Sequence, residues 1–289
     1  MKKASNNYSQ TLLLLMKLSL VLSTYNRPDA LSFALAALLN QSDKDFELVI
    51  ADDGSGSETR QVVQDFQNKF FYPIIHAWQP DEGFRLSASR NNAVRQSSGD
   101  YLVFLDGDCL ARPNFIQNHK SLAEKNYFVT GNRVLLSEAF TKDLLASKAE
   151  VFNPSLAELF ALKKQQKINR IFSLLDFTSI SAFRKNQSNN WKKLRGCNFA
   201  AWRTDIYEVN GFDENFKGWG FEDSDFAVRM LNKGFKRKAG SFSTTVFHLY
   251  HTETKKAQRG PSWDILMSRL KDGSSYCPDG LKKTASKHK

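Results

Sequence analysis

The sequence predicts an α/β domain whose mostly parallel sheet is covered by helices on both faces. Short apolar runs alternate with segments of helical periodicity from residue 18 to residue 105. This alternation favours parallel strands joined by crossover helices. Polar residues follow the apolar runs, and open α/β sheets bind ligands at that carboxyl edge because helix N-termini and loops converge there. The first half of the chain therefore predicts a site for a nucleotide or a phosphate.

Strands and helices are expected in strict alternation through this half. The strands fall at 18–22, 46–50, 73–77 and 101–105. The helices between them present apolar side chains at helical spacing, among them Leu31, Leu35, Leu38, Val62, Val63 and Phe66. Pro28 suits the first turn of the first helix, and Gly99 follows the third helix, which covers 87–97.

The composition limits the classes of partner. The chain has 289 residues, and its 41 lysines and arginines against 30 acidic residues give a net charge of +11. Such a charge predicts an anionic partner, which could be a phosphorylated substrate, an acidic membrane or a nucleic acid. The 23 phenylalanines sit mostly in apolar runs rather than among basic residues, so the pattern does not favour nucleic-acid binding.

The cysteines and the N-terminal residues favour a cytoplasmic protein. Cys109, Cys197 and Cys277 are odd in number and widely spaced, which is typical of reduced thiols. The apolar run that begins at Leu12 is interrupted at Lys17, whereas a bilayer span takes about 20 apolar residues. We expect residues 1–15 to form a flexible extension.

Residues 148–195 differ from the rest of the chain. They combine apolar side chains at helical spacing, such as Phe152, Leu156, Ile168 and Ile171, with clusters of lysine and arginine. This pattern predicts a basic amphipathic insertion of two helices. Either the helices pack on the core with a solvated basic face, or that face docks to anionic lipid or to a lipid-linked acceptor.

Asp106 and Asp108 directly follow the most apolar of the expected strands, with Gly107 between them. Carboxylates on either side of a residue that permits close backbone approach make a hard-oxygen site for Mg²⁺ or Mn²⁺. An Asp-x-Asp triplet alone is a weak signal, and the buried strand before it strengthens the prediction.

A second cluster of acidic and aromatic side chains surrounds two glycines at 218–226. Asp223 and Asp225 fall in the first turn of an expected helix, where carboxylates can simply cap the helix. Capping does not account for Trp219, which lies between Gly218 and Gly220. An indole beside a carboxylate suits a sugar ring, because the ring stacks on the indole and its hydroxyls find an acceptor.

His248 and His251 are three residues apart and follow the acidic cluster at 218–226. In a helix this spacing places both rings on one face, whereas in a strand it places them on opposite faces. A lone histidine is usually structural. A pair this close after an acidic site favours metal binding by at least one of the two.

Together these residues resemble the inverting glycosyltransferases of family 2, which have the GT-A fold. The resemblance extends over residues 18–255. Its motifs are Ser23-Thr-Tyr-Asn-Arg27-Pro28, Asp52-Asp53-Gly54-Ser55, Asp81-Glu-Gly-Phe-Arg85 through Arg90-Asn91, and Asp106-Gly-Asp108. Gly211-Phe-Asp-Glu and Gly218-Trp-Gly-Phe-Glu222-Asp223 are similar to the carboxy-terminal part of β-1,4-galactosyltransferases and of chondroitin-type polymerases.

The resemblance implies a division of the chain. Residues 16–260 would form the GT-A domain, with a nucleotide-sugar half at 16–147, the insertion at 148–195 and a smaller acceptor and metal half at 196–260. Residues 261–289 would form a basic C-terminal tail. The chain turns polar and basic from Asp272 onward, which predicts a mobile end.

The resemblance also implies roles for single residues. On the donor side, the residues expected at the nucleotide, the diphosphate or the donor sugar are Thr24, Tyr25, Arg27, Asp52 or Asp53, Arg85, Arg90 and Asp106. On the metal side, Asp108 would bind Mn²⁺ or Mg²⁺ together with His248, His251 or both. On the acceptor side, Trp219, Gly220 and Glu222 would hold the sugar, and Asp223 would be the catalytic base.

The implied function is transfer of a hexose or N-acetylhexosamine from a UDP-sugar to a carbohydrate or lipid-linked glycan of bacterial lipopolysaccharide or capsule. Contact with anionic lipid would place the enzyme at the inner face of the cytoplasmic membrane. One alternative is a non-catalytic sugar- or nucleotide-binding module of the same fold. Another is a nucleotidyltransferase, which would be expected to show a glycine-rich loop where this chain has 23–27. The sequence specifies neither the sugar nor the oligomeric state.

Overall fold

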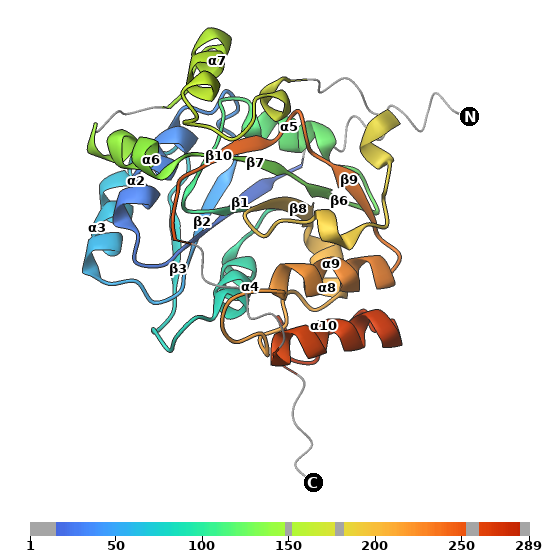
Figure 1. Ribbon diagram of the computed structural model, residues 1–289. Coiled ribbons are helices and arrows are strands. Elements are labelled where there is room, and N and C mark those ends of the chain that lie inside the picture. Colours follow the sequence, from blue (N-terminus) through green and yellow to red (C-terminus); the bar gives the residue numbers. More distant parts are fainter. Residues whose placement is uncertain (1–15, 148–151, 177–181, 253–259, 284–289) are drawn as a thin grey trace.

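A seven-stranded mixed sheet forms the centre of the protein, with helices on both faces (Figure 1). The computed structural model describes residues 16–147, 152–176, 182–252 and 260–283. The strands, in their order across the sheet, are β3 (Ile75–Trp78), β2 (Glu47–Asp52), β1 (Leu18–Thr24), β4 (Tyr101–Asp106), β8 (Asn198–Trp202), β6 (Tyr127–Thr130) and β9 (Lys236–Ala239). Only β8 runs antiparallel to its neighbours β4 and β6 among these described strands. The predicted mostly parallel sheet is confirmed.

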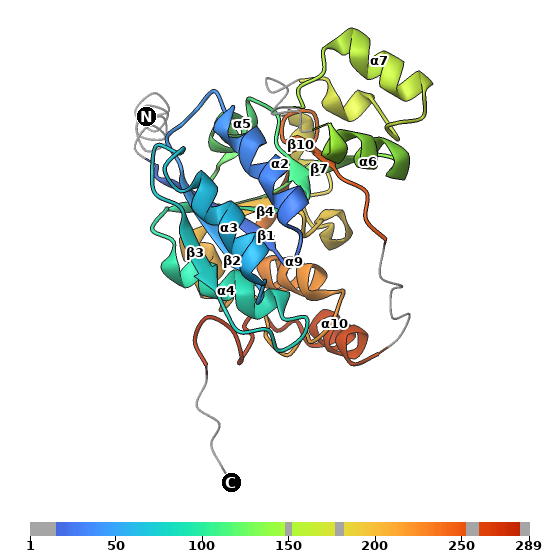
Figure 2. The same ribbon diagram turned by 90° about the vertical axis from the view of Figure 1, so that its left-hand side faces the viewer.

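Alternate residues of the central strands supply two separate cores. Leu20 and Leu22 of β1 pack with one group of helices, α2 (Pro28–Leu39), α3 (Ser57–Phe66) and α5 (Phe115–Leu122). Val21 faces the other group, α4 (Leu86–Gln96), α8 (Arg203–Glu208) and α9 (Glu222–Asn232). Figure 2 shows α2 and α3 on one side of the sheet and α4 and α9 on the other. A strand buried on both faces has a continuous apolar sequence, and this explains why the sequence of 18–22 and 101–105 predicts strands.

A small second sheet positions the late histidines. It has the order β5 (Cys109–Leu110), β10 (Thr245–His248) and β7 (Asn132–Leu135). His248 pairs with Cys109 in the antiparallel register, and the amide of Leu249 donates to the carbonyl of Asp108 at 2.9 Å. The strand β10 therefore delivers its C-terminal end to the acidic segment that follows β4.

The insertion contains one α-helix rather than the predicted two. α7 (Leu156–Lys164) begins with a capping box between Ser155 and Glu158. The second predicted helix is wrong among the described residues, because Ile168 instead forms a β-bridge with Leu136. Three short 3₁₀ helices follow, η1 (Phe172–Leu174), η2 (Ala182–Lys185) and η3 (Trp191–Lys193). Residues 148–151 and 177–181 lie outside the described part of the chain.

The predicted C-terminal tail is also wrong over 261–283. α10 (Pro261–Asp272) packs beside α9, and Cys277 and Leu281 are buried behind it. Asn210 holds this segment, because its Nδ2 donates to the carbonyl of Cys277 at 2.7 Å and its Oδ1 accepts from the amide of Lys282 at 2.8 Å. Residues 284–289, like the expected extension 1–15, lie outside the described residues. No helix among the described residues is long and apolar enough to cross a membrane.

Replacement of Phe199 by alanine should reduce the free energy of unfolding by about 3–5 kcal/mol, because it leaves a cavity in the core beneath α9. The Phe199 ring is fully buried and stacks on Phe104 at a centroid distance of 4.6 Å. Denaturant unfolding measures the change. Phe71→Ala is the control, since Phe71 is 75% exposed and its loss should cost less than about 0.5 kcal/mol. Equal losses for the two variants would contradict this account of the core.

Candidate active site

The polar segments of the first half meet at one edge of the sheet, as the sequence predicts. Thr24 ends β1 opposite Asp52 at the end of β2, and Ser23 lies opposite Asp106 at the end of β4. Parallel register places these carboxyl ends side by side, so residues far apart in the sequence share one surface. Asp108 lies two residues beyond this edge.

The buried guanidinium of Arg90 connects this edge to the start of α9. Its Nη2 donates to Asp106 Oδ1 at 3.0 Å and to the carbonyl of Gly196 at 2.9 Å. Its Nη1 lies 3.8 Å from Glu222 Oε1 and has no hydrogen-bond partner in the described part of the chain. Burial raises the pKa of Asp106, and the charge of Arg90 opposes that rise. The donor-side and acceptor-side carboxylates of the predicted site are therefore joined through one cation.

A cavity of about 300 Å³ lies between the two sets of carboxylates. Its lining includes the predicted residues Arg90, Asp106, Trp219, Gly220, Glu222 and Asp223. The sequence interpretation missed Arg133 and Arg195, which also line it. Arg133 donates to Cys197 Sγ at 3.6 Å, and neither guanidinium has a carboxylate partner within 4 Å among the described residues. The cavity therefore presents two guanidinium groups that form no ion pair among the described residues.

Glu222 is buried at the beginning of α9 and follows a turn with an unusual backbone. Gly218, Gly220 and Phe221 all have positive φ angles, of 82°, 108° and 74°. Burial, followed by the negative charge of Asp223, raises the pKa of Glu222 to about 7. Its Oε2 has no hydrogen-bond partner among the residues described. The neutral and the charged form of this carboxyl group are therefore both accessible near neutral pH.

Asp223 has a different environment, although it is the next residue. Its Oδ2 accepts from the amide of Gly196 at 2.9 Å, and its Oδ1 accepts from the amide and the hydroxyl of Ser224 at 2.6 and 3.2 Å. A side chain at Gly196 would crowd its neighbours, because its Cβ would lie 3.3 Å from both Arg90 Nη2 and Asp223 Cβ. Glycine at this position therefore lets the arginine and the carboxylate approach the same backbone.

Asp225, the other candidate cap, belongs to the interior. It is fully buried and accepts from Arg229 Nε at 2.7 Å. Trp219, by contrast, is 36% exposed and lies at the cavity. The structure therefore brings Trp219, Glu222 and Asp223 to the cavity and keeps Asp225 away from it.

The two adjacent aspartates at the end of β2 are both buried by protein contacts. Asp52 accepts from the amide of Ser55 and contacts His76 Nε2, each at 2.8 Å. Burial favours the neutral form of Asp52, but these hydrogen bonds outweigh it and lower its pKa. Asp53 accepts from Gln79 Nε2 and from the amide of Arg85, each at 2.6 Å. Burial raises the pKa of Asp53.

The remaining predicted donor-side residues lie on the loops beside these aspartates. The hydroxyl of Tyr25, which is 47% exposed, donates to Asp81 at 2.9 Å. Arg27 pairs with Asp29 at 2.9 Å, and its pKa is raised by that hydrogen bond and, less strongly, by the charge of Asp108. Both side chains are thus close to the predicted site and held by carboxylates of their own loops.

Arg85 immediately precedes α4 and is half-buried. Its Nη1 lies 2.8 Å from Glu82, its Nη2 donates to the carbonyl of Pro80, and its amide donates to Asp53. These contacts hold the loop between β3 and α4 against the end of β2. A substrate that reaches Arg85 would have to compete with Glu82 for its guanidinium.

Asp108, His248 and His251 form the predicted metal-ligating group. One ligand atom from each residue can be chosen so that all three lie within 4.8 Å of one another. His248 Nε2 is 3.6 Å from Asp108 Oδ1, and His251 Nε2 is 3.4 Å from Asp108 Oδ2. The strand ends at His248, so the chain turns and His251 returns to the same side, which a continued strand would have prevented.

The orientation of the imidazoles fits a metal site. His248 Nδ1 contacts the carbonyl of Leu249 at 2.9 Å, and His251 Nδ1 contacts the carbonyl of Thr252 at 3.2 Å. A carbonyl at Nδ1 fixes the proton there and leaves the Nε2 lone pair free toward Asp108. Metal–ligand bonds of about 2.0–2.2 Å place neighbouring ligand atoms about 3–3.5 Å apart. The distance from each imidazole Nε2 to an oxygen of Asp108 is near this range, and ligand atoms of the three residues lie within 4.8 Å of one another. The residues present therefore fit a divalent cation.

Comparisons with known proteins agree with this arrangement. A model of glycosyl transferase family 2 matches residues 19–202, and a second model, described as the N-terminal domain of galactosyltransferase, matches residues 178–252. Validoxylamine A glucosyltransferase of Streptomyces hygroscopicus subsp. jinggangensis is 30% identical over 227 residues, which are 75% of this chain and 52% of that protein. Chondroitin synthase of Escherichia coli is 27% identical over 87% of this chain and 37% of that protein. The chain thus spans about half or less of the length of these relatives.

Solved structures show the same fold. The crystal structure of Staphylococcus aureus TarS residues 1–349 in complex with UDP matches 89% of this chain and 65% of that chain, with a TM-score of 0.60 and 16% identity. A second crystal structure of the same fragment, in complex with UDP-GlcNAc, matches with a TM-score of 0.56 and 15% identity. The predicted GT-A fold is confirmed by these matches.

Glu222→Gln should stabilise the protein above pH 7 but not below pH 4.5. The pKa of Glu222 is about 7 in the folded state against an ordinary value of 4.5, so the folded protein keeps a proton that the unfolded chain loses. Wild-type stability should therefore fall as the pH rises between these values, by at most about 3 kcal/mol. Denaturant unfolding near pH 5 and near pH 8 measures the difference, with Glu138→Gln on the surface as control. An equal effect of Glu222→Gln at both pH values would contradict the raised pKa.

Proposed function

Because the chain belongs to glycosyl transferase family 2, we propose that it transfers a sugar from a UDP-sugar to a hydroxyl group of a carbohydrate acceptor, with inversion at the anomeric carbon. The observation that supports this most is the joint placement of two groups of side chains. Asp108, His248 and His251 form a site suited to a cation, and Asp106, Glu222 and Asp223 line a cavity of about 300 Å³. A nucleotidyltransferase is not supported, since the family match covers most of the domain.

UDP as the donor nucleotide is supported by the similar TarS fragment, whose crystal structures include complexes with UDP and with UDP-GlcNAc. In this chain Thr24, Tyr25, Arg27 and Arg85 would line the nucleotide pocket. Of Asp52 and Asp53 at the end of β2, we assign the contact with the uracil base to Asp53, because Asp53 is 4% exposed whereas Asp52 is fully buried. Asp106 would lie beside the ribose and the donor sugar.

A divalent cation held by Asp108, His248 and His251 would offset the negative charge that develops on the departing diphosphate. Two imidazoles and one carboxylate favour Mn²⁺ over Mg²⁺, because Mg²⁺ prefers oxygen ligands alone. The guanidiniums of Arg133 and Arg195 would add further stabilisation for an oxyanion at the cavity. Their lack of carboxylate partners among the described residues leaves their donors available for such a group.

The proposed reaction is a single displacement. Asp223 takes the proton of the acceptor hydroxyl as that oxygen forms a bond to the anomeric carbon. The bond from this carbon to the diphosphate breaks on the opposite face, and UDP leaves with the electron pair. Backside attack inverts the centre, so one carboxylate base suffices and no second nucleophilic carboxylate is required. Glu222 would bind a hydroxyl of the acceptor sugar while the ring stacks on Trp219 beside Gly220.

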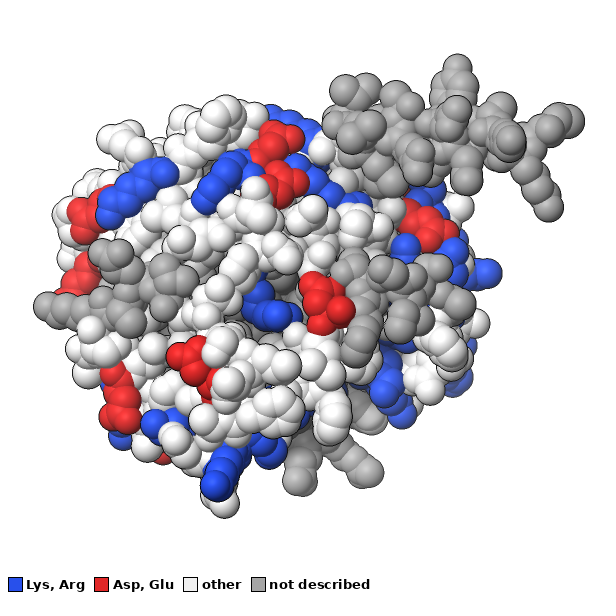
Figure 3. All heavy atoms as spheres, turned by 90° about the horizontal axis from the view of Figure 1, so that it is seen from above, with Lys and Arg blue, Asp and Glu red and all other residues white. Residues whose placement is uncertain are grey.

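We further propose that the acceptor is a glycan of a bacterial surface polysaccharide, such as lipopolysaccharide or capsule. The relatives named above include a polymer synthase. Peripheral contact with a membrane would involve the insertion, where Phe160, Phe172 and Phe183 are 59%, 79% and 77% exposed near several lysines. Figure 3 shows the face on which α7 lies, where basic and acidic side chains are interspersed and no patch of one sign dominates. Apolar insertion, more than charge, would therefore determine such binding.

Incubation of the protein with a panel of UDP-sugars and Mn²⁺ should give slow release of UDP from one donor, because many transferases hydrolyse their donor without an acceptor. EDTA should abolish the release, and Asp108→Asn should behave like the EDTA-treated protein. If no donor is hydrolysed, the shift in melting temperature caused by UDP with Mn²⁺ tests whether the protein binds the donor nucleotide. Absence of any shift would contradict the transferase proposal and favour a non-catalytic module of this fold.

Asp223→Asn should reduce transfer to an acceptor by at least about 100-fold, since a general base typically contributes about 10²–10⁴ in rate. Binding of UDP and Mn²⁺ should be unchanged, because Asp223 is proposed to act on the acceptor and not on the donor. The asparagine keeps one of the two amide contacts, since its single oxygen can accept from Gly196 or from Ser224. Steady-state kinetics and calorimetric titration measure the two quantities. Asp272→Asn, on the surface of α10, is the matched control. Near-normal turnover of Asp223→Asn would remove Asp223 from the role of base.

A further inference from the structure

Helix α10 contacts the start of α9 although it lies outside the residues that the two family models match. The two family matches end at residues 202 and 252, and α10 covers Pro261–Asp272. It contacts the polypeptide on both sides of Glu222 and Asp223, through Trp263 and through Arg269. Both contacts bear on the geometry of the candidate site.

The first contact supports a strained residue. Phe221, immediately before Glu222, has a φ of 74°, which is rare for a bulky side chain and costs free energy. Its ring packs edge-on against the indole of Trp263, with centroids 5.2 Å apart and an interplanar angle of 61°. Such a backbone persists only where surrounding contacts hold it. Trp263 is one of those contacts.

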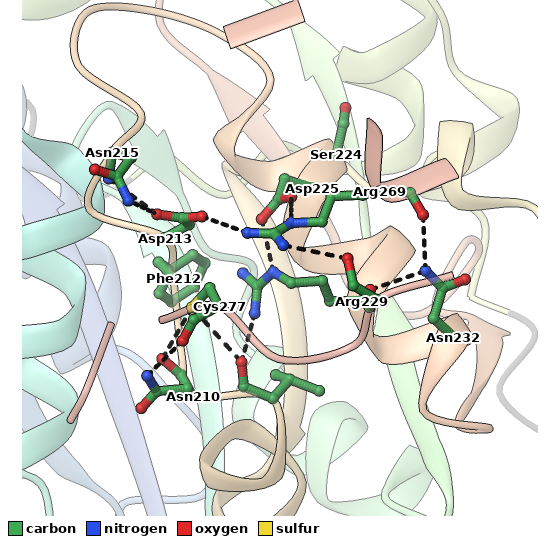
Figure 4. A network of polar contacts seen from close by, with 12 residues as sticks. Asn210, Phe212, Asp213, Asn215, Ser224, Asp225, Arg229, Asn232, Arg269 and Cys277 are labelled. Atoms are coloured by element: carbon green, nitrogen blue, oxygen red, sulfur yellow. Dashed lines mark hydrogen bonds and ion pairs between the residues drawn. The ribbon is translucent and has the colours of Figure 1, made fainter. Parts of the chain in front are cut away.

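The second contact is a buried ionic network (Figure 4). Arg269 donates from Nε to Asp225 Oδ1 at 3.3 Å and from Nη2 to Asp213 Oδ2 at 2.7 Å. The other oxygen of Asp225 accepts from Arg229 Nε at 2.7 Å. Asp225 and Arg229 are fully buried, so their charges are stable only while the network is complete. Arg269 therefore fixes the first turn of α9 to the segment around Asp213.

The same segment continues to the centre of the site. Phe212, adjacent to Asp213, exchanges backbone hydrogen bonds with the side chain of Asn91 at 2.7 and 2.9 Å. Its ring lies 5.5 Å from the guanidinium carbon of Arg90. A displacement of α10 would therefore alter the contacts of Phe221 and Asp225 and the packing around Arg90.

We propose that Trp263 and Arg269 are positioning residues that hold Glu222 against Arg90 and Asp223 against the amide of Gly196. The inference rests on the proposed function, in which these two carboxylates bind and deprotonate the acceptor. Neither Trp263 nor Arg269 lines the cavity, so they act through α9 and not on the substrate.

The test compares Trp263→Leu, Arg269→Gln and Arg269→Lys with Met267→Ala, whose side chain is 43% exposed on the same helix. Loss of either contact should lower kcat for transfer by about 10- to 100-fold, because small misplacements of a catalytic group have such effects. The KM for the UDP-sugar and the affinity for UDP with Mn²⁺ should stay unchanged. Arg269→Lys should recover part of the activity lost in Arg269→Gln. Met267→Ala should match the wild type.

A normal kcat in folded Trp263→Leu and Arg269→Gln would overturn the proposal. An equal loss of donor affinity would also overturn it, because it would indicate a general packing role. If the wild type turns over no UDP-sugar, the hydrogen-exchange rate of a backbone amide in the site still tests whether Trp263 positions Asp223. The amide of Gly196 is protected by Asp223, so it should exchange faster in Trp263→Leu than in Met267→Ala. Equal exchange in these two variants would refute positioning independently of the proposed function.

Discussion

The buried guanidinium of Arg90 is the constraint on which the candidate site depends. A fully buried charge is costly unless it is paired, and Arg90 pairs with Asp106 at the end of β4 and approaches Glu222 at the start of α9. These two carboxylates belong to halves of the domain that are far apart in the sequence. Because one cation serves both, the distance across the cavity is set by the dimensions of a single side chain. Gly196 completes this arrangement, since its carbonyl accepts from Arg90 while its amide donates to Asp223.

The residues that line the cavity at the start of α9 are held in an unfavourable environment. Burial and, after it, the negative charge of Asp223 raise the pKa of Glu222, and the charge of Arg90 opposes this rise without cancelling it. The preceding turn adds backbone strain at Phe221. Sites of this kind persist where the surrounding structure over-determines them. Here the surroundings are the network of Asp213, Asp225, Arg229 and Arg269, which ties α9 to α10 beneath the turn.

Local signals in the sequence predict the elements that lie at the centre of the sheet. β1 and β4 are buried on both faces, so their sequences are continuously apolar and the carboxylates after β4 are easily recognised. The histidine spacing indicates a metal site but not its geometry, which depends on β10 ending at His248. Arg133 and Arg195 could not be recognised, because only the tertiary fold separates a cavity-lining arginine from a solvated one. The prediction of a second helix in the insertion is wrong for a similar reason, because Ile168 forms a β-bridge with Leu136, which lies 32 residues earlier in the sequence.

The two neighbouring carboxylates illustrate how environment, not residue type, assigns a role. Glu222 and Asp223 are adjacent on one helical turn, yet Glu222 has an oxygen in a buried position without a hydrogen-bond partner among the described residues, whereas both oxygens of Asp223 accept hydrogen bonds. A carboxyl group with a pKa near 7 can donate as well as accept, which suits a group that holds a sugar hydroxyl. A carboxylate whose two oxygens accept from backbone amides is held in one direction, which suits a group proposed to accept a proton in the transition state. If the glutamate and the aspartate were exchanged between positions 222 and 223, the carboxyl group at 222 would still be buried and the one at 223 would still face the amide donors. The burial and the amide donors belong to the positions and not to the side chains.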